Sequence, residues 1–310
     1  MNSEDDNQDQ PNPTHDCVRR GQEDAQAQEE RLEDPDDDVD LSREEGLQVR
    51  KRASVDSYVV HEVIRRQGHD ELRRPALSLF WSGIAAGIAI ASSVLGEGML
   101  ESALPDTPWR PIIASFGYTV GFLIVIMGRM QLFTESTLSA TIPVATSPTL
   151  SNLLRLGRLW GIVFIANMLG TLFIMLLVGN HLVGWESHLE GMIAVSRSIL
   201  THTPFETVLG GIPAGFLLAA VAWSLPVGRG QEFWIILFFT YFVGLGNFAH
   251  VVAGSGEAWL LVVTGNASVG FAIFGFILPA LLGNIIGGTL IFALLAHAQV
   301  SPEIENGRED

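Results

Sequence analysis

The chain of 310 residues is 48% apolar and only 17% charged, with a formal net charge of −16 and a mean hydropathy of +0.31. This balance is typical of a membrane protein and unusual for a soluble domain of the same length. The negative charge, with no basic stripe, argues against nucleic-acid binding. The single cysteine, Cys17, excludes a disulfide framework and a thiolate zinc site.

Acidic residues are concentrated at the N-terminus. Residues 1–70 contain 20 acidic and 9 basic side chains, a net charge of −11. Residues 1–50 cannot bury enough apolar surface to offset the entropy of an ordered chain, so we expect an acidic, disordered cytoplasmic head. The sequence that follows predicts an amphipathic surface helix over 51–74, a transmembrane pore domain over 75–298 and a polar cytoplasmic tail over 299–310.

The segment before the pore domain has helical periodicity. Its apolar positions share one face of a helix; they are Val55, Tyr58, Val59, Val63 and Ile64. Such a helix is expected to lie at the bilayer surface, next to the first membrane crossing.

Six stretches are long and apolar enough to cross a bilayer, which takes about 20 residues as a helix. They are 77–97, 112–131, 158–179, 207–228, 233–252 and 272–296. Arginine and lysine collect before the first stretch, between the second and third, and between the fourth and fifth. Because cytoplasmic loops carry an excess of these residues, we expect a multi-pass inner-membrane protein with both termini in the cytoplasm.

Two parts of the pore domain do not fit unbroken helices. Residues 258–302 contain no Asp, Glu, Lys or Arg, and this run is about twice the length of a single crossing. The polar sequence QLFTEST interrupts the second stretch and is followed by Pro143 and Pro148. Irregular backbone at membrane depth needs protein or a water-lined cavity to satisfy its amides. The second and fifth helices are therefore expected to be broken around a cavity.

A weak internal repeat indicates two halves. Thr134 and His250 each follow a glycine by six residues, and Asn-x-x-Gly motifs begin 33 and 34 residues further on, at Asn167 and Asn284. This pairing predicts that Thr134 corresponds to His250. It also predicts an all-α membrane protein of six transmembrane helices in an inverted 3+3 repeat, with the permeation site where the two breaks meet.

His250 is the most informative single position. An ionisable side chain at this depth is costly unless it meets water or a partner; the alternative is a neutral imidazole that bonds a free carbonyl in a kinked helix. As substrate-pathway residues, His250 would relay a proton and Thr134 would orient the substrate by hydrogen bonding. The sequence has no motif of a nucleotide-driven pump, hydrolase or metalloenzyme, so we expect no enzyme activity, cofactor or metal.

Leu132, Phe133 and Phe248 are candidates for a constriction. Bulky apolar groups at a narrow point block hydrated ions, while a neutral molecule passes more easily. Ordinary helix packing is the alternative for these side chains.

Four polar residues are candidates for support of the breaks and their vestibules. Arg129 and Glu135 flank the interruption of the second helix, where they either form an ion pair or face an aqueous vestibule. Asn167 and Asn284 open the two motifs of the repeat, and we assign them to the same supporting role.

Four short stretches resemble the formate/nitrite transporter family over about residues 70–298. They are LFT ending at Thr134, FAH ending at His250, AVAW at 220–223 and LPALLGNIIGGTL at 278–290. The order and spacing of the first two and the last make the resemblance specific.

The resemblance implies an aquaporin-like fold of six helices, assembled as a homopentamer with one pore per subunit. It implies that small monovalent anions cross, often with a proton. By position, Thr134 and His250 would line the pore centre between two apolar constrictions, with Leu132 and Phe133 at one of them. Gln131 stands where the family commonly has an acidic residue.

These features predict a channel-like secondary transporter for small monovalent weak-acid anions such as formate, nitrite or acetate, coupled to protons through His250. One alternative is a channel for water or a small neutral solute. Another is a membrane-anchored interaction protein whose acidic head recruits partners and whose pore is vestigial. The expected partners are a small anion or its conjugate acid, further copies of the chain in a homopentamer and the lipid bilayer, but no nucleic acid. The sequence identifies neither the solute nor the direction of flux.

Overall fold

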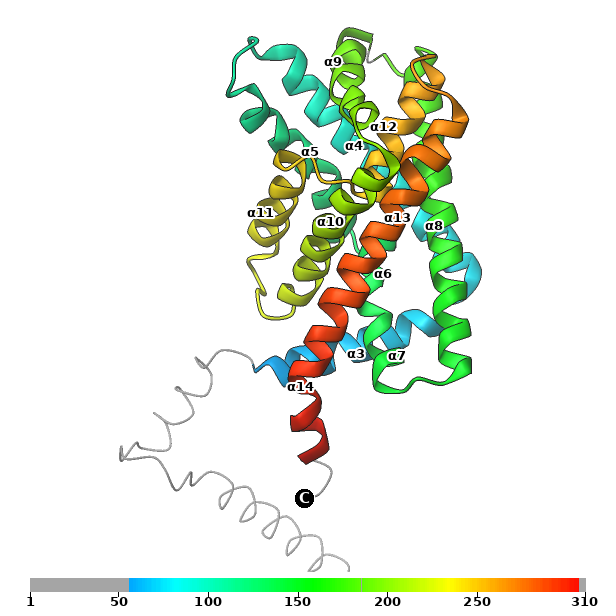
Figure 1. Ribbon diagram of the computed structural model, residues 1–310, viewed down its shortest axis with the longest axis vertical. Helices are drawn as coiled ribbons and strands as arrows, with labels where there is room; N and C mark the ends of the chain where they lie inside the picture. Colours follow the sequence, from blue (N-terminus) through cyan, green and yellow to red (C-terminus); the bar gives the residue numbers. More distant parts are fainter. Residues whose placement is uncertain (1–55, 185, 307–310) are drawn as a thin grey trace, which may run out of the picture. The chain divides into compact units, whose positions relative to one another are not determined.

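The computed structural model describes residues 56–184 and 186–306, and every regular element in these ranges is a helix (Figure 1). The head expected over 1–50 lies outside the described residues, as do residues 307–310 of the expected tail. The described part of the chain is therefore all-α, as the sequence predicts.

The helices follow one another in two series and a last long helix. The first series is α3 (Ser57–Arg73), α4 (Ala76–Ala103), α5 (Arg110–Met127), α6 (Phe133–Ser139), α7 (Thr141–Thr146) and α8 (Leu150–Gly179). The second is α9 (Glu186–Ser196), the 3-10 helix η1 (Arg197–Thr201), α10 (Pro204–Ser224), α11 (Glu232–Leu245) and α12 (Val251–Val263). The last helix runs through the π-helical η2 (Phe271–Ile277), α13 (Leu278–Ile285), the π-helical η3 (Ile286–Ala293) and α14 (Leu294–Asn306).

Five helices in the described residues are long and apolar enough to cross a membrane: α4, α5, α8, α10 and the last helix over Phe271–Ser301. They confirm five of the six predicted spans. The prediction for 233–252 differs, because two shorter apolar helices, α11 and α12, share this region. The 14 residues of α11 make a helix of about 21 Å, which is less than the roughly 30 Å of a bilayer's hydrocarbon core.

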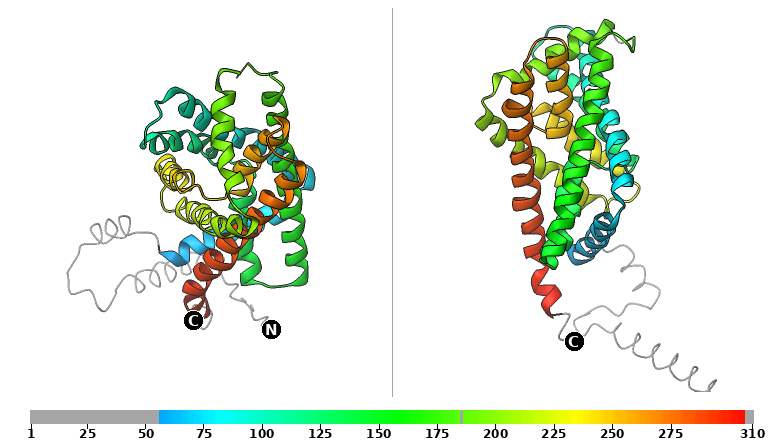
Figure 2. Two further views of the ribbon diagram at one scale, coloured as in Figure 1. Left: turned by 45° about the horizontal axis from the view of Figure 1, so that its top comes forward. Right: turned by 90° about the vertical axis from the view of Figure 1, so that its right-hand side faces the viewer.

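Glycines bring the long helices together in pairs. α4 packs against α8, and α10 packs against the last helix; α8 and the last helix are the long rods of Figure 2. A Cβ atom added to Gly170 of α8 would lie 2.8 Å from the Cα of Gly87 in α4, and one added to Gly211 of α10 would lie 3.0 Å from the Cα of Gly283 in α13. Small residues at such contacts let backbones approach closely inside a membrane.

The chain leaves helical geometry in two short turns of the same kind. Residues 128–132 separate α5 from α6, and residues 246–250 separate α11 from α12. The second residue of each turn has a positive φ angle, 51° at Arg129 and 49° at Asn247. This left-handed backbone suits asparagine but is uncommon for arginine, so the surrounding contacts must hold Arg129 in place.

Asn167 of α8 holds the first turn. Its Oδ1 accepts the backbone N–H of Phe133 at 2.9 Å, and its Nδ2 donates to the carbonyl oxygens of Gly83 at 2.8 Å and Gln131 at 3.0 Å. The side chain is fully buried. Asn167 therefore satisfies an N–H that the start of α6 would leave without a helical partner.

Asn284 of the last helix holds the second turn with the same set of bonds. Its Oδ1 accepts the N–H of Val251 at 2.9 Å, and its Nδ2 donates to the carbonyls of Gly211 at 2.9 Å and Ala249 at 2.8 Å. It too is fully buried. Buried backbone groups at both turns are thus satisfied by protein instead of water.

These bonds correct the predicted pairing of Thr134 with His250. The residue before each anchored N–H is Leu132 in the first turn and His250 in the second. The asparagine bonds, and not the similarity of residue types, define which positions are equivalent. Leu132 therefore corresponds to His250. The predicted register was wrong by two residues.

Helix α3 packs on the protein through one face. It contacts α7, α8 and α14, and Val60, Ile64 and Leu72 are buried there. Of the residues predicted for the apolar face, Ile64 is buried, whereas Tyr58 and Val59 are 42% and 46% exposed.

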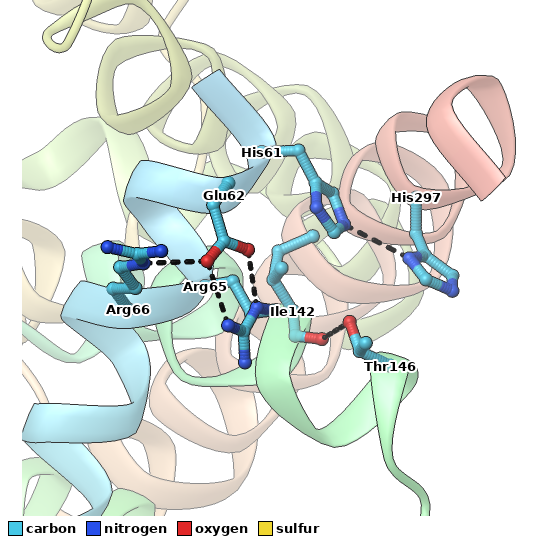
Figure 3. A network of polar contacts seen from close by, with 7 residues as sticks. All are labelled: His61, Glu62, Arg65, Arg66, Ile142, Thr146 and His297. Carbon is cyan, nitrogen blue, oxygen red and sulfur yellow. Dashed lines mark hydrogen bonds and ion pairs between the residues drawn. The ribbon is translucent and has the colours of Figure 1, made fainter. Parts of the chain in front are cut away.

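A histidine pair joins α3 to α14, as Figure 3 shows. His61 Nε2 lies 3.1 Å from His297 Nδ1, and the two rings stack with centroids 5.2 Å apart. Next to this pair along α3, Glu62 accepts hydrogen bonds from Arg65 and Arg66, each at 2.6 Å. Burial, together with the neighbouring His297, lowers the pKa of His61 from 6.5 to about 4.

Replacing either asparagine anchor with alanine is expected to destabilise the fold. Each buried N–H or C=O left without a partner costs roughly 1–3 kcal/mol. We expect N167A and N284A to lower the midpoint of thermal unfolding in detergent, followed by tryptophan fluorescence. The matched control is N180A, which removes only an exposed bond to the carbonyl of Leu176. Midpoints equal to the control for both variants would contradict the anchoring role.

The packing of α3 is expected to loosen in acid. A lowered histidine pKa means that the folded state favours the neutral ring, so its stabilisation is complete above pH 6.5 and is lost as the pH falls toward 4. Amide hydrogen exchange in α3, corrected for intrinsic rates, should be faster at pH 5 than at pH 7.5. H61Q, whose side chain does not titrate, should lose this difference. Protection of the unmodified protein that does not change with pH would refute the prediction.

Candidate functional site

Thr134 and His250, the two predicted pathway residues, meet in the structure. Thr134 lies in the first turn of α6, and His250 caps the N-terminus of α12. Thr134 Oγ1 is 2.8 Å from His250 Nε2. Their exposed fractions are 0% and 1%, so two residues 116 positions apart form a dry polar contact.

The surroundings of His250 determine where its proton lies. Nδ1 accepts the backbone N–H of Ala253 at 3.1 Å. A ring nitrogen that accepts a hydrogen bond carries no proton, so the neutral ring has its proton on Nε2. Nε2–H therefore donates to Thr134, whose own hydroxyl proton remains available. The ring of Phe122 packs edge-on against the imidazole at 4.9 Å and keeps it in this orientation.

A cavity of about 260 Å³ reaches His250 from the side that carries α9. Figure 1 shows α9 at one end of the helices. We call this cavity the α9-side vestibule. It is lined by Glu97, Tyr118, Val195, Ser198, Ile199, His202, Glu206, Thr207, Gly210, Val243, Gly244, Gly246, Asn247, Phe248, Ala249, His250, Gly254, Glu257 and Phe276.

A larger cavity of about 610 Å³ opens beside α3. Figure 1 shows α3 at the end of the helices opposite to α9. We call this cavity the α3-side vestibule. It is lined by Val63, Ile64, Gln67, Glu71, Arg74, Ile126, Met127, Arg129, Met130, Gln131, Glu135, Ser139, Ala222, Leu225, Pro226, Arg229, Glu232 and Ile236. Gln131 and Glu135 are close neighbours of Thr134 in the chain, so the Thr134–His250 contact lies between the two vestibules.

Helix α3 and Arg74, the residue that follows it, contribute polar groups to the lining of the α3-side vestibule. Arg74 Nη1 donates to Gln131 Oε1 at 2.7 Å, and Ser139 Oγ donates to Glu71 Oε2 at 2.9 Å. Burial raises the pKa of the Glu71 carboxyl. These bonds tie α3 to the turn before Phe133 and to α6.

Arg129 and Glu135 follow the second of the two predicted alternatives. Both line the α3-side vestibule. Among the described residues, no ion pair joins Arg129 to Glu135. Each side chain therefore faces the vestibule.

The three predicted constriction residues take different places. Phe248 lines the α9-side vestibule. Leu132 is fully buried and directly precedes α6. The ring of Phe133 packs against Trp160 at 5.8 Å and Phe164 at 5.4 Å on α8, so its contacts are those of helix packing, the alternative considered from the sequence.

The charged vestibule residues that the sequence reasoning missed include Glu97 and Glu257 on one side, and Glu71 and Arg74 on the other. A lone carboxylate in an apolar run is the signal that was available for the first two. Glu97 ends the first predicted span, and Glu257 follows His250 by seven residues. No such signal marked Glu71 and Arg74, because α3 was expected to face the bilayer surface.

Comparison with known proteins identifies relatives of the whole pore domain. Residues 58–298 match the family model of the formate/nitrite transporters. The inner membrane protein YfdC of Escherichia coli (strain K12) is 35% identical over 286 residues, which cover 90% of this chain and 92% of that protein. The formate channel FocA of Haemophilus influenzae is 26% identical over 245 residues, which cover 70% of this chain and 84% of that protein.

Two solved structures share the fold. A pentameric formate channel with formate bound has a TM-score of 0.59 at 21% identity, over 73% of this chain and 97% of that one. An FNT family ion channel has a TM-score of 0.62 at 18% identity, over 76% and 96%. The match over residues 58–298 and the similarity to YfdC show that the chain belongs to the formate/nitrite transporter family.

Proposed function

We propose that the chain is a channel-like secondary transporter for a small monovalent weak acid, such as formic, nitrous or acetic acid. The observation that carries the proposal is the buried hydrogen bond between Thr134 and His250, placed between two vestibules. A family of formate and nitrite transporters, and a solved relative with formate bound, support this substrate class.

We propose further that the pore is built from an inverted 3+3 repeat of six crossings. Two of the crossings are discontinuous: α5 continues into α6, and α11 continues into α12. The matching bonds of Asn167 and Asn284, and the matching positive φ angles at Arg129 and Asn247, support this arrangement. Equal local geometry in two segments of opposite direction is what such a repeat requires.

The substrate crosses the centre as the neutral acid. Moving a bare anion into a dry, apolar passage costs far more than moving its protonated form. Leu132, Phe248 and the fully buried Phe122 supply the apolar barrier around the pair. Transport of acid instead of anion accounts for coupling to protons without a separate proton path.

His250 acts by positioning Thr134, in place of the proton relay expected from the sequence. Its Nδ1 already accepts the N–H of Ala253, so a second ring proton would displace the N-cap of α12. With Nε2–H donating to Thr134 Oγ1, the hydroxyl proton of Thr134 points to a passing substrate. Thr134 thus offers a donor to the carbonyl or nitrosyl oxygen of the acid.

We propose that the α3 side faces the cytoplasm of a cell whose inner membrane holds the protein. The basic residues before α4, between α5 and α8, and between α10 and α11 support this orientation. The same residues support a cytoplasmic location for both termini.

The central pair can be tested by transport into proteoliposomes under an imposed pH gradient. We expect uptake of at least one of formate, nitrite and acetate above that of empty liposomes. T134V, which keeps the shape but removes the hydroxyl, should slow uptake about tenfold, since one lost hydrogen bond in the barrier is worth about 1.4 kcal/mol. T134S should retain most activity. H250N, which keeps a cap acceptor but loses the donor to Thr134, should also be slow.

Two results would reject this function. One is uptake equal to empty liposomes for all three acids, and the other is undiminished uptake by T134V. Osmotic swelling that does not depend on pH, with no acid uptake, would instead indicate a channel for water or a neutral solute.

We propose that the chain assembles as a homopentamer. The solved relative named as a pentameric formate channel supports this, and so does an apolar surface on α5 and α11 that includes Phe116, Trp234, Phe238 and Phe242. Native mass spectrometry of the detergent-solubilised protein should give five times the chain mass of 33.7 kDa. A monomer or dimer as the dominant species, under conditions that keep the protein folded, would contradict the assembly.

A further inference from the structure

The two vestibules differ in the charges that line them. The α3-side vestibule has three arginines and three glutamates: Arg74, Arg129, Arg229, Glu71, Glu135 and Glu232. The α9-side vestibule has Glu97, Glu206 and Glu257 but no lysine or arginine among its lining residues. A pathway for a weak acid therefore runs between the α3-side vestibule, which has mixed charges, and the α9-side vestibule, which is acidic.

Glu97 and Glu257 are the two carboxylates of the α9-side vestibule that bear on its selectivity. Glu97 lies in α4, and Glu257 lies in α12, seven residues after His250. Both are only half-buried, since they open onto the cavity. Within residues 56–184 and 186–306, neither carboxylate has a hydrogen-bond or ion-pair partner. Tyr118, on α5, also lines this vestibule.

The other charged groups at the α9 end of the helices interact with other partners. Glu101, one turn beyond Glu97, is paired with Arg110 at 2.8 Å. Glu206 bonds the N–H and hydroxyl of Thr203 in the capping box that starts α10. Arg197 is exposed and donates to Asn266 at 3.3 Å. No cation of the described residues therefore faces Glu97 and Glu257.

The two remaining titratable residues of the cavity are histidines. His202 lies at the exposed rim, against Thr201 and the carbonyl of Ser198. His250 closes the inner end and is held by Ala253 and Thr134. Neither one is bonded to a glutamate of the vestibule.

We propose that Glu97 and Glu257 select the protonated acid at the α9-side vestibule and exclude its free anion. A carboxylate in a half-enclosed cavity repels an entering anion, because solvent screens its charge only weakly. The neutral acid carries no net charge, and its O–H is a donor that a carboxylate accepts. This inference deepens the proposed function and rests on it for the identity of the solute. The charge of the vestibule itself can be measured independently.

The first test measures the electrostatic potential of the vestibule without transport. Ser198 lines the cavity, and its hydroxyl makes no hydrogen bond among the described residues. A protein with S198C, and with C17S to remove the single native cysteine, reports on the cavity. In detergent, a cationic methanethiosulfonate should react with Cys at this position at least tenfold faster than an anionic one, relative to a free thiol. E97Q with E257Q should bring the ratio close to that of the free thiol.

The matched control is E190Q, which removes the same charge from an exposed residue of α9 outside the cavity. It should leave the ratio of rates unchanged. A ratio that is the same with and without the two glutamates, or faster reaction of the anionic reagent in the parent protein, would overturn the inference. The two single variants E97Q and E257Q provide the same comparison should the double variant fail to fold.

The second test follows formate uptake into proteoliposomes as a function of external pH. Uptake by the parent should fall with rising pH in step with the fraction of neutral acid. The double glutamine variant should take up formate at least threefold faster than the parent above pH 6, because the free anion can then enter the vestibule and gain a proton from water there, before it crosses the centre as the neutral acid. A pH profile identical to that of the parent would overturn the inference while leaving the proposed function intact. A parent protein that transports no acid would reject the proposed function, and the reagent ratio would still decide the sign of the vestibule.

Discussion

A backbone that leaves helical geometry inside a bilayer has no water to bind, so its hydrogen bonds must come from the protein. In this chain Asn167 and Asn284 supply them, each with one acceptor and two donor bonds at 2.8–3.0 Å. Glycine contacts bring the helices that carry these asparagines close enough to reach the turns. Because the anchors fix where α6 and α12 begin, they also fix the first turns that hold Thr134 and His250. The 2.8 Å contact at the centre is a consequence of those two amides.

The central Thr134–His250 contact and the two vestibules make different contributions to selectivity. The Thr134–His250 contact is dry and uncharged, and it offers a passing molecule a hydroxyl donor. Charge is kept in the vestibules, as arginines and glutamates on the α3 side and as glutamates alone on the α9 side. A solute that changes its protonation on the way can satisfy both environments, whereas one of fixed charge cannot. Under the proposed function, this division favours a weak acid over a permanent anion.

Hydropathy and local motifs predicted what depends on neighbours in the chain. Five of the six spans, the interruption near QLFTEST and the meeting of Thr134 with His250 followed from composition, spacing and the family resemblance. Features that depend on distant contacts were missed. The two-residue error in the repeat arose because the asparagine bonds define the equivalent positions. A comparison of residue types along the chain does not reveal those bonds. The packing of Phe133 on α8 and the convergence of Glu97 with Glu257 likewise require the arrangement of helices in space.

The π-helical segments of the last helix link the orientations of its two ends, which a regular α-helix would not do in the same way. Asn284 lies in α13, the α-helical segment between η2 and η3, and His297 lies beyond η3 in α14. A π turn holds more residues than an α turn, so rewinding η3 into α geometry would rotate α14 about its own axis relative to α13. Torsion of a single rod can therefore couple the docking of α3, through His61 and His297, to the amide that fixes the start of α12.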